Sequence, residues 1–175
     1  RNILFVAGMA VVVAAGLVLM SAGKRPVHLF MCGDSTMADK TELDISPERG
    51  WGQLFPSFLS DEVVVENHAM NGRSTKSFVN EGRWDSVLVR IHRGDVVIIQ
   101  FGHNDAKLAD PTKYASVEDY QRNLVTMAQQ AKKKGAQVII ATPINRRSFS
   151  KETGAFICKH GGYPEAARRA AKSAG

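Results

Sequence analysis

The chain has 175 residues, of which 44% are hydrophobic and 23% charged, and its formal net charge is +6 at pH 7. This composition is typical of a globular protein with one sizeable core, and it excludes a disordered chain. Basic residues are scattered or form short clusters without interleaved aromatic residues, so no nucleic-acid partner is indicated. Solvated surface charge explains them most simply, and a polyanionic polysaccharide such as pectin is the alternative partner.

Residues 3–20 form an uncharged apolar run near the start of the chain. The run is longer than the usual apolar region of a signal peptide, about 7–15 residues, and just reaches the roughly 17–25 of a membrane span. Small residues at Ser21 and Gly23 would suit a signal peptidase. We therefore expect residues 1–23 to be a cleaved export signal, with an N-terminal anchor as the alternative, and the protein to be secreted or periplasmic.

Strand and helix patterns alternate along the rest of the chain. Continuous apolar runs predict buried strands, and a 3.6-residue period predicts helices, one of them kinked or shortened by Pro56. Strands that are apolar on both faces and alternate with helices specify a parallel sheet in a three-layer α/β/α fold, with a flavodoxin-like strand order 2-1-3-4 as the expectation from the fold class. The predicted strands are 27–32, 63–67, 96–99 and 138–141, and the predicted helices are 51–59, 84–91, 117–131 and 164–175.

Polar groups follow the carboxyl ends of the first three predicted strands. Ser35 follows the first, Gly72 the second and Asn104 the third. Because parallel strands end at one edge of a sheet, we expect these groups to meet there. We interpret Ser35 as a nucleophile, and its own N–H, the Gly72 N–H and the Asn104 side-chain amide as donors to an oxyanion. For Gly-Asp-Ser taken alone, an ordinary turn that closes a strand would be the simpler interpretation.

Three motifs carry a family resemblance. Gly33-Asp34-Ser35, the loop 71–74 and Gly102-His103-Asn104-Asp105 resemble the first three sequence blocks of the SGNH (GDSL) hydrolases. The longer stretches 67–75 and 160–166 resemble the rhamnogalacturonan acetylesterase branch of that family. The resemblance implies a serine esterase that removes acetyl groups from pectic polysaccharide such as rhamnogalacturonan, through an acyl-serine intermediate and without a metal or an organic cofactor.

One block of the family is absent from these 175 residues. It is Asp-x-x-His, which follows a fifth strand and supplies the base and its orienting carboxylate. A serine hydroxyl is a weak nucleophile without a base. Since the sequence also begins with Arg1, we expect a longer protein, in which 24–175 is an incomplete hydrolase domain with little activity alone. His160 is the best alternative base within the chain, whereas His68 and His103 are expected to be structural or to line the substrate site.

Four residues are candidates for lining the substrate site: Asp34, Trp51, Arg73 and His103. The alternatives are hydrogen bonds to the loop backbone for Asp34, core packing for Trp51 and a surface salt bridge for Arg73. No Cys/His spacing resembles a zinc site, and the two cysteines are expected to be free thiols.

Two other functions remain open. The first is another SGNH activity, such as that of a lipase, a thioesterase or a peptidoglycan O-acetylesterase. The second is a non-catalytic carbohydrate-binding protein, which a natural lack of Asp-x-x-His would favour. In the leading interpretation the partner is an acetylated polysaccharide, any membrane contact is confined to the N-terminal segment, and the protein is a monomer.

Overall fold

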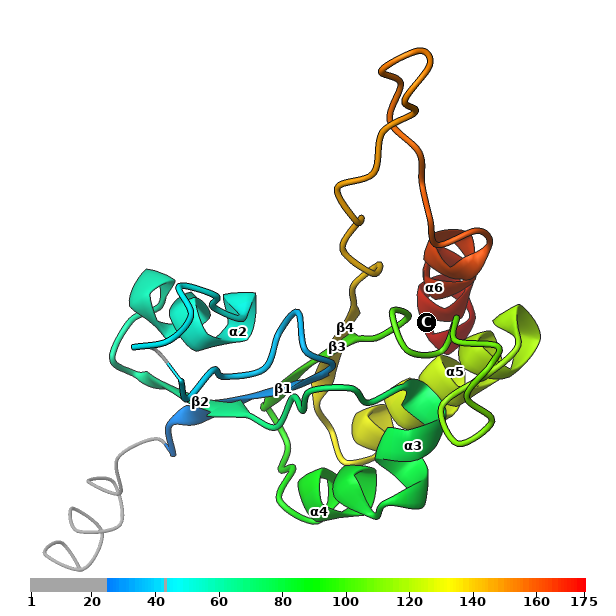
Figure 1. Ribbon diagram of the computed structural model, residues 1–175. Helices are drawn as coiled ribbons and strands as arrows, with labels where there is room; N and C mark the ends of the chain where they lie inside the picture. The colour runs from blue at the N-terminus through cyan, green and yellow to red at the C-terminus, as the bar shows by residue number, and fades with distance from the viewer. Residues whose placement is uncertain (1–24, 43) are drawn as a thin grey trace, which may run out of the picture.

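The computed structural model describes residues 25–42 and 44–175. Its four parallel strands form one sheet in the order β2-β1-β3-β4, which confirms the predicted flavodoxin-like order (Figure 1). The apolar run 3–20, with the predicted export signal or anchor, lies outside the described residues, and the predicted domain boundary at residue 24 stays a prediction. The strands are β1 (Val27–Gly33), β2 (Val63–Asn67), β3 (Val96–Gln100) and β4 (Gln137–Ile140).

The central strand β1 pairs with neighbours on both sides. Val27 lies opposite Val63 of β2, and Leu29 lies opposite Val96 of β3. Side chains from both faces of β1 are buried, as the continuous apolar run in its sequence predicted. The strand therefore delivers the residues that follow Gly33 to the middle of the carboxyl edge of the sheet.

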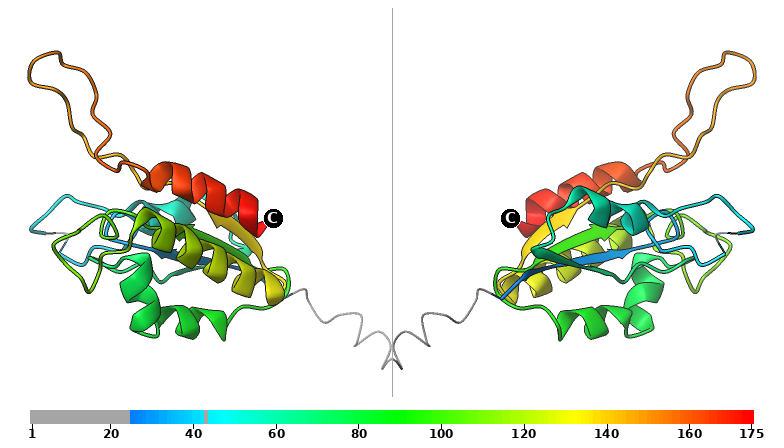
Figure 2. Two further views of the ribbon diagram at one scale, coloured as in Figure 1. Left: turned by 90° about the vertical axis from the view of Figure 1, so that its right-hand side faces the viewer. Right: turned by 90° about the vertical axis from the view of Figure 1, so that its left-hand side faces the viewer.

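Helices cover both faces of the sheet, so the predicted three-layer arrangement is confirmed (Figures 1 and 2). The short helix α2 and the 3-10 helix η1 pack on one face, mainly over β1 and β2. The other four helices cover the opposite face. Among the described residues, no helix combines the length and the apolar character needed to cross a membrane. The bounds are α2 (Trp51–Leu54), η1 (Phe55–Phe58), α3 (Thr75–Asn80), α4 (Arg83–Leu88), α5 (Val117–Lys133) and α6 (Tyr163–Ala174).

Helix α3 was not predicted from the sequence. Its six residues are too few for an apolar period, and a pair of serines fixes its start instead. Ser74 Oγ accepts the N–H of Ser77 at 3.1 Å, and the N–H of Ser74 donates to Ser77 Oγ at 2.9 Å. This reciprocal cap satisfies two backbone donors and allows a helix to begin directly after the loop that follows β2.

Other helices differ from the prediction only in their limits. Pro56 lies in the first turn of η1, so the segment predicted as one helix is divided into α2 and η1. Helix α4 ends at Leu88, before the predicted end. Helix α5 begins as predicted, because Ser116 Oγ accepts the N–H of Asp119 at 3.1 Å.

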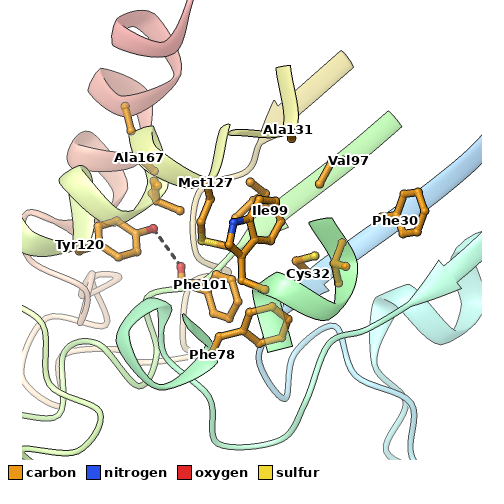
Figure 3. Close-up of a cluster of buried hydrophobic side chains, with 14 of the residues drawn as sticks. Phe30, Cys32, Phe78, Val97, Ile99, Phe101, Tyr120, Met127, Ala131 and Ala167 are labelled. Atoms are coloured by element: carbon orange, nitrogen blue, oxygen red, sulfur yellow. Dashed lines mark hydrogen bonds between the residues drawn. The ribbon is translucent and has the colours of Figure 1, made fainter. Parts of the chain in front are cut away.

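The larger core lies between the sheet and the four helices that cover it (Figure 3). Trp84 of α4 is 2% exposed and packs within this core. Both cysteines are free, as predicted: Cys32 is buried in this core and Cys158 is exposed. The hydroxyl of Tyr120 donates to the carbonyl oxygen of Phe101 at 3.0 Å within the core (Figure 3).

We expect Tyr120→Phe to lower the free energy of unfolding by about 1–3 kcal/mol, because the buried Phe101 carbonyl then loses its hydrogen bond. Denaturant unfolding followed by circular dichroism measures this difference. Tyr114→Phe is the matched control, since the Tyr114 hydroxyl makes no hydrogen bond with the described residues, and it should stay within about 0.5 kcal/mol of the wild type. Equal losses in the two variants would contradict the role given to the Tyr120 hydroxyl.

Candidate active site

Ser35 lies on a loop whose geometry is fixed at both of the preceding residues. A Cβ at Gly33 would lie 2.7 Å from the carbonyl oxygen of Gln100, so only glycine fits at this position. Asp34 is 1% exposed, and its Oδ1 accepts the N–H and the hydroxyl of Thr36, each at 2.9 Å. The chain therefore turns sharply at the end of β1 and leaves Ser35 half-buried beside a cavity.

Lys40 links the Ser35 loop to the loop that follows β2. Its Nζ donates to the carbonyl oxygen of Ser35 at 2.6 Å and to Asn71 Oδ1 at 2.9 Å, and only 13% of its side chain is exposed. This bridging role of Lys40 was not predicted from the sequence, since no motif spacing relates Lys40 to Asn71. The cavity beside these groups has a volume of about 400 Å³ and is lined by Ser35, Lys40, Thr41, Glu42, Ser46, Glu48 and Asn71.

Asn104 links the loop after β2 to the loop after β3. Its Nδ2 donates to the carbonyl oxygen of Arg73 at 2.8 Å, so one hydrogen of the amide is used and the other remains. Gly72, directly before Arg73, has a φ of +78°, a conformation that favours glycine. The Lys40 and Asn104 contacts thus connect the three loops that the sequence analysis expected to converge.

Two backbone N–H groups at this edge are available as hydrogen-bond donors to a ligand. Within the described residues, the N–H groups of Ser35 and Gly72 donate to no backbone or side-chain acceptor. Backbone N–H groups are nearly always paired unless water or a ligand is their partner. With the remaining amide hydrogen of Asn104, they are the donors that an oxyanion would need.

Asp105 is a buried carboxyl group that holds the start of α3. Its Oδ1 accepts the N–H of Thr75 at 3.0 Å and the Thr75 hydroxyl at 2.5 Å, whereas its Oδ2 is buried without a hydrogen-bond partner among the described residues. Burial away from water raises the pKa of Asp105 to about 7. In mildly acidic solution the Asp105 carboxyl group is therefore protonated in the folded protein.

This raised pKa predicts a pH dependence of stability. Below about pH 4 both the folded and the unfolded chain hold the Asp105 proton; as the pH rises toward 7 only the unfolded chain loses it, and the free energy of unfolding falls. Between pH 4 and 7, Asp105 should lower the free energy of unfolding by up to about 4 kcal/mol. Asp105→Asn should remove this decline, measured as denaturant unfolding between pH 4 and 8, because its amide does not titrate.

Asp85→Asn is the matched control for this measurement, because Asp85 is exposed on α4. Its stability should follow the wild-type pH profile. A wild-type decline that persists in Asp105→Asn would show that other carboxyl groups cause it.

The described histidines make hydrogen bonds to groups other than Ser35. His160 is 2% exposed, and its Nε2 donates to the carbonyl oxygen of Ile144 at 2.9 Å. Burial also lowers the pKa of His160. Nε2 of His103 donates to the same Ile144 oxygen at 2.7 Å. In the part of the chain that the structure describes, no histidine is hydrogen-bonded to Ser35 Oγ, so the expectation that the chain lacks a base for Ser35 stays a prediction.

The contacts of the other candidate residues favour structural roles for two of them. Asp34 holds the loop through Thr36, and the indole N–H of Trp51 donates inward to Gln100 Oε1 at 2.7 Å. Arg73 is half-buried and pairs with Glu81 at 3.0 Å. These contacts are the alternatives predicted from the sequence for Asp34 and Arg73, whereas Trp51 and His103 remain candidates for lining the substrate site.

The carboxyl edge of this parallel sheet combines a serine with N–H groups that lack acceptors among the described residues, which are groups that acyl transfer requires. The chain belongs to the GDSL-like Lipase/Acylhydrolase family, which it matches over residues 31–175. It is 40% identical to the rhamnogalacturonan acetylesterase RhgT of Bacillus subtilis over 149 residues, which cover 85% of this chain and 62% of that protein. It is also 37% identical to the probable rhamnogalacturonan acetylesterase YesY of the same organism over 131 residues, which cover 74% of this chain and 58% of that protein.

A solved structure has the same fold. The crystal structure of the Bacillus subtilis protein YxiM superimposes with a TM-score of 0.73 at 28% sequence identity, and the match covers 83% of this chain and 41% of that one. The chain thus spans about three fifths of the length of the acetylesterases that it matches. The family and the fold are established by these comparisons.

Proposed function

We propose that the protein is a serine esterase that removes acetyl groups from pectic polysaccharide such as rhamnogalacturonan. The observation that supports the proposal is that Lys40 and Asn104 connect three loops at the carboxyl edge, while the N–H groups of Ser35 and Gly72 donate to no acceptor among the described residues. Acyl transfer needs a nucleophile and preorganised donors in one place. The names of the relatives RhgT and YesY support the acetyl group and the polysaccharide.

In this proposal Ser35 Oγ attacks the carbonyl carbon of the acetyl ester. The Oγ–C bond forms while the hydroxyl proton passes to a base, and the carbonyl oxygen becomes an oxyanion held by the N–H groups of Ser35 and Gly72 and by Asn104 Nδ2. Collapse of the intermediate breaks the bond between the acetyl carbon and the sugar oxygen, and this oxygen takes the proton from the base and leaves as a hydroxyl. Water then releases acetate from the acyl-serine by the same steps.

The neighbouring cavity suits a polar substrate. The described residues that line its volume of about 400 Å³ have charged or polar side chains. Lys40 lies on its wall beside Ser35 and pairs with Glu48 at 3.3 Å, and Glu42 adds a further carboxylate to the lining. A hydrated sugar fits these walls better than a lipid chain does. Secretion or export to the periplasm belongs to this proposal, since pectic polysaccharide is found outside the cell.

The substrate is tested by expressing the full gene product and measuring acetate release from acetylated rhamnogalacturonan, acetylated xylan and acetylated peptidoglycan. We expect the highest kcat/KM on rhamnogalacturonan. Equal rates on all three polymers would contradict the pectic substrate, and hydrolysis of long-chain lipid esters alone would contradict the carbohydrate substrate.

A further inference from the structure

A long arm stands clear of the rest of the fold. Residues 144–159, which we call the arm, leave the carboxyl end of β4 and return to α6 (Figures 1 and 2). Fourteen of these 16 residues are exposed. The arm buries little surface against the described residues, and an exposed loop of this kind is suited to a contact with another molecule.

The arm is ordered by its own contacts. Phe149 and Phe156 form an antiparallel bridge, and the N–H of Ile157 donates to the carbonyl oxygen of Ser148 at 2.8 Å. The phenyl rings meet edge to face with centroids 6.0 Å apart, yet the side chains remain 53% and 50% exposed. An aromatic pair that is left half-exposed on a projecting hairpin is typical of a contact surface.

The arm is also strongly basic. It carries four cations and one carboxylate, which is Glu152. Among the described residues, no carboxylate lies within ion-pair distance of any of the four cations. Exposed cations without partners attract a polyanion and release its counterions on binding. The four cations are Arg146, Arg147, Lys151 and Lys159.

The base of the arm is fixed beside the candidate active site. The carbonyl oxygen of Ile144, at the start of the arm, accepts hydrogen bonds from His103 at 2.7 Å and from His160 at 2.9 Å. The two histidine rings lie against each other with centroids 4.5 Å apart. His103 is the neighbour of Asn104 in the chain, so the arm begins next to a proposed oxyanion donor and extends outward from it.

We propose that the arm binds a polysaccharide whose sugar rings carry carboxylates, along a stretch outside the ester-cleaving cavity. The four cations pair with the carboxylates of successive acidic sugars, and the two phenyl rings pack against the apolar faces of sugar rings. The choice of this partner rests on the proposed function, because an acidic polymer that reaches the arm would also reach Ser35. The arm thus raises the local concentration of acetylated segments at the cavity.

The test is affinity electrophoresis of the full gene product in gels that contain polygalacturonate, with neutral galactan as the reference polymer. The double variant Arg147→Glu/Lys151→Glu should weaken retardation by polygalacturonate by about fivefold or more, and added salt should reduce the wild-type retardation. At high salt, where the charge contribution is screened, Phe149→Ala/Phe156→Ala should be retarded by polygalacturonate less than the wild type is.

The matched control is Lys133→Glu/Lys134→Glu at the end of α5, which changes the net charge equally at a place away from the arm. It should keep most of the wild-type retardation. Equal weakening by both double reversals would overturn the proposal, because net charge alone would then account for binding. Wild-type binding to neutral galactan as strong as to polygalacturonate would overturn it too.

Two further measurements distinguish polysaccharide binding by the arm from dimerisation and from the esterase activity itself. Size-exclusion chromatography shows whether the aromatic pair instead joins two copies of the chain; loss of a dimer in Phe149→Ala/Phe156→Ala with unchanged polygalacturonate binding would overturn the proposal. Turnover of a small aryl acetate tests the esterase without any polymer. Arm-dependent binding without esterase turnover would therefore reject only the proposed esterase function. Turnover without arm-dependent binding would reject only the proposal that the arm binds an acidic polysaccharide.

Discussion

In the full gene product, Ser35→Ala is expected to lower acetate release by about 10⁴-fold or more. The Oγ–carbon bond of the acyl intermediate cannot form without the hydroxyl, and the oxyanion donors alone give only residual catalysis. Activity on an aryl acetate, followed by release of the phenol, measures the loss. Folding should be unaffected, because Ser35 Oγ makes no hydrogen bond with the described residues.

Ser57→Ala is the matched control, since Ser57 is exposed on η1 on the surface of the domain. It should retain wild-type turnover. Substantial acetate release by Ser35→Ala, after its melting temperature has been shown to match the wild type, would end the assignment of Ser35 as the nucleophile.

Removal of the Asn104 amide has the second-largest expected effect. Asn104→Ala should lower kcat by about 10²–10³-fold while KM changes little, because the donor acts on charge that develops only in the transition state. Asn104→Asp should lose at least as much activity, since a carboxylate of the same size donates no hydrogen bond and repels the oxyanion. Steady-state kinetics on an aryl acetate gives both constants.

A structural effect must be separated from this catalytic one, because Asn104 also donates to the carbonyl oxygen of Arg73. The melting temperature of each variant reports the loss of that hydrogen bond. Asn80→Ala, at an exposed position of α3, is the control and should leave both constants unchanged. A kcat for Asn104→Ala above a tenth of the wild-type value would contradict the role of Asn104 in an oxyanion hole.

The hydrogen bonds of the described histidines lead to a related expectation. The 175 residues alone should hydrolyse aryl acetates slowly or not at all, because no described histidine is hydrogen-bonded to the Ser35 hydroxyl that must lose its proton. Both histidines of the arm base are used to hold the Ile144 carbonyl. Robust turnover by these residues, lost in Ser35→Ala, would show that a base is present among them.

The buried character of the strands was readable from the sequence, whereas their order was an expectation from the fold class that the structure confirmed. Parallel strands that are covered on both faces appear as continuous apolar runs, and β1 and β3 are such runs. Short helices were read less well, since α3 is held by the Ser74 and Ser77 cap and has no apolar period to detect. The exposed arm was read only as a long loop, because its aromatic pair is separated by six intervening residues without a strand pattern.

The sequence by itself determined the sheet, its family and the three polar groups at the carboxyl edge, because buried strands and the motifs that follow them are local patterns. Only the tertiary structure decided that Lys40 bridges Ser35 and Asn71, that Asp105 is buried with one oxygen unpartnered, and that the arm is anchored at Ile144. Lys40 and Asn71 are 31 positions apart, and His103 and Ile144 are 41 positions apart. Contacts over such distances form only when the sheet brings separate loops to one edge, so no local pattern predicts them.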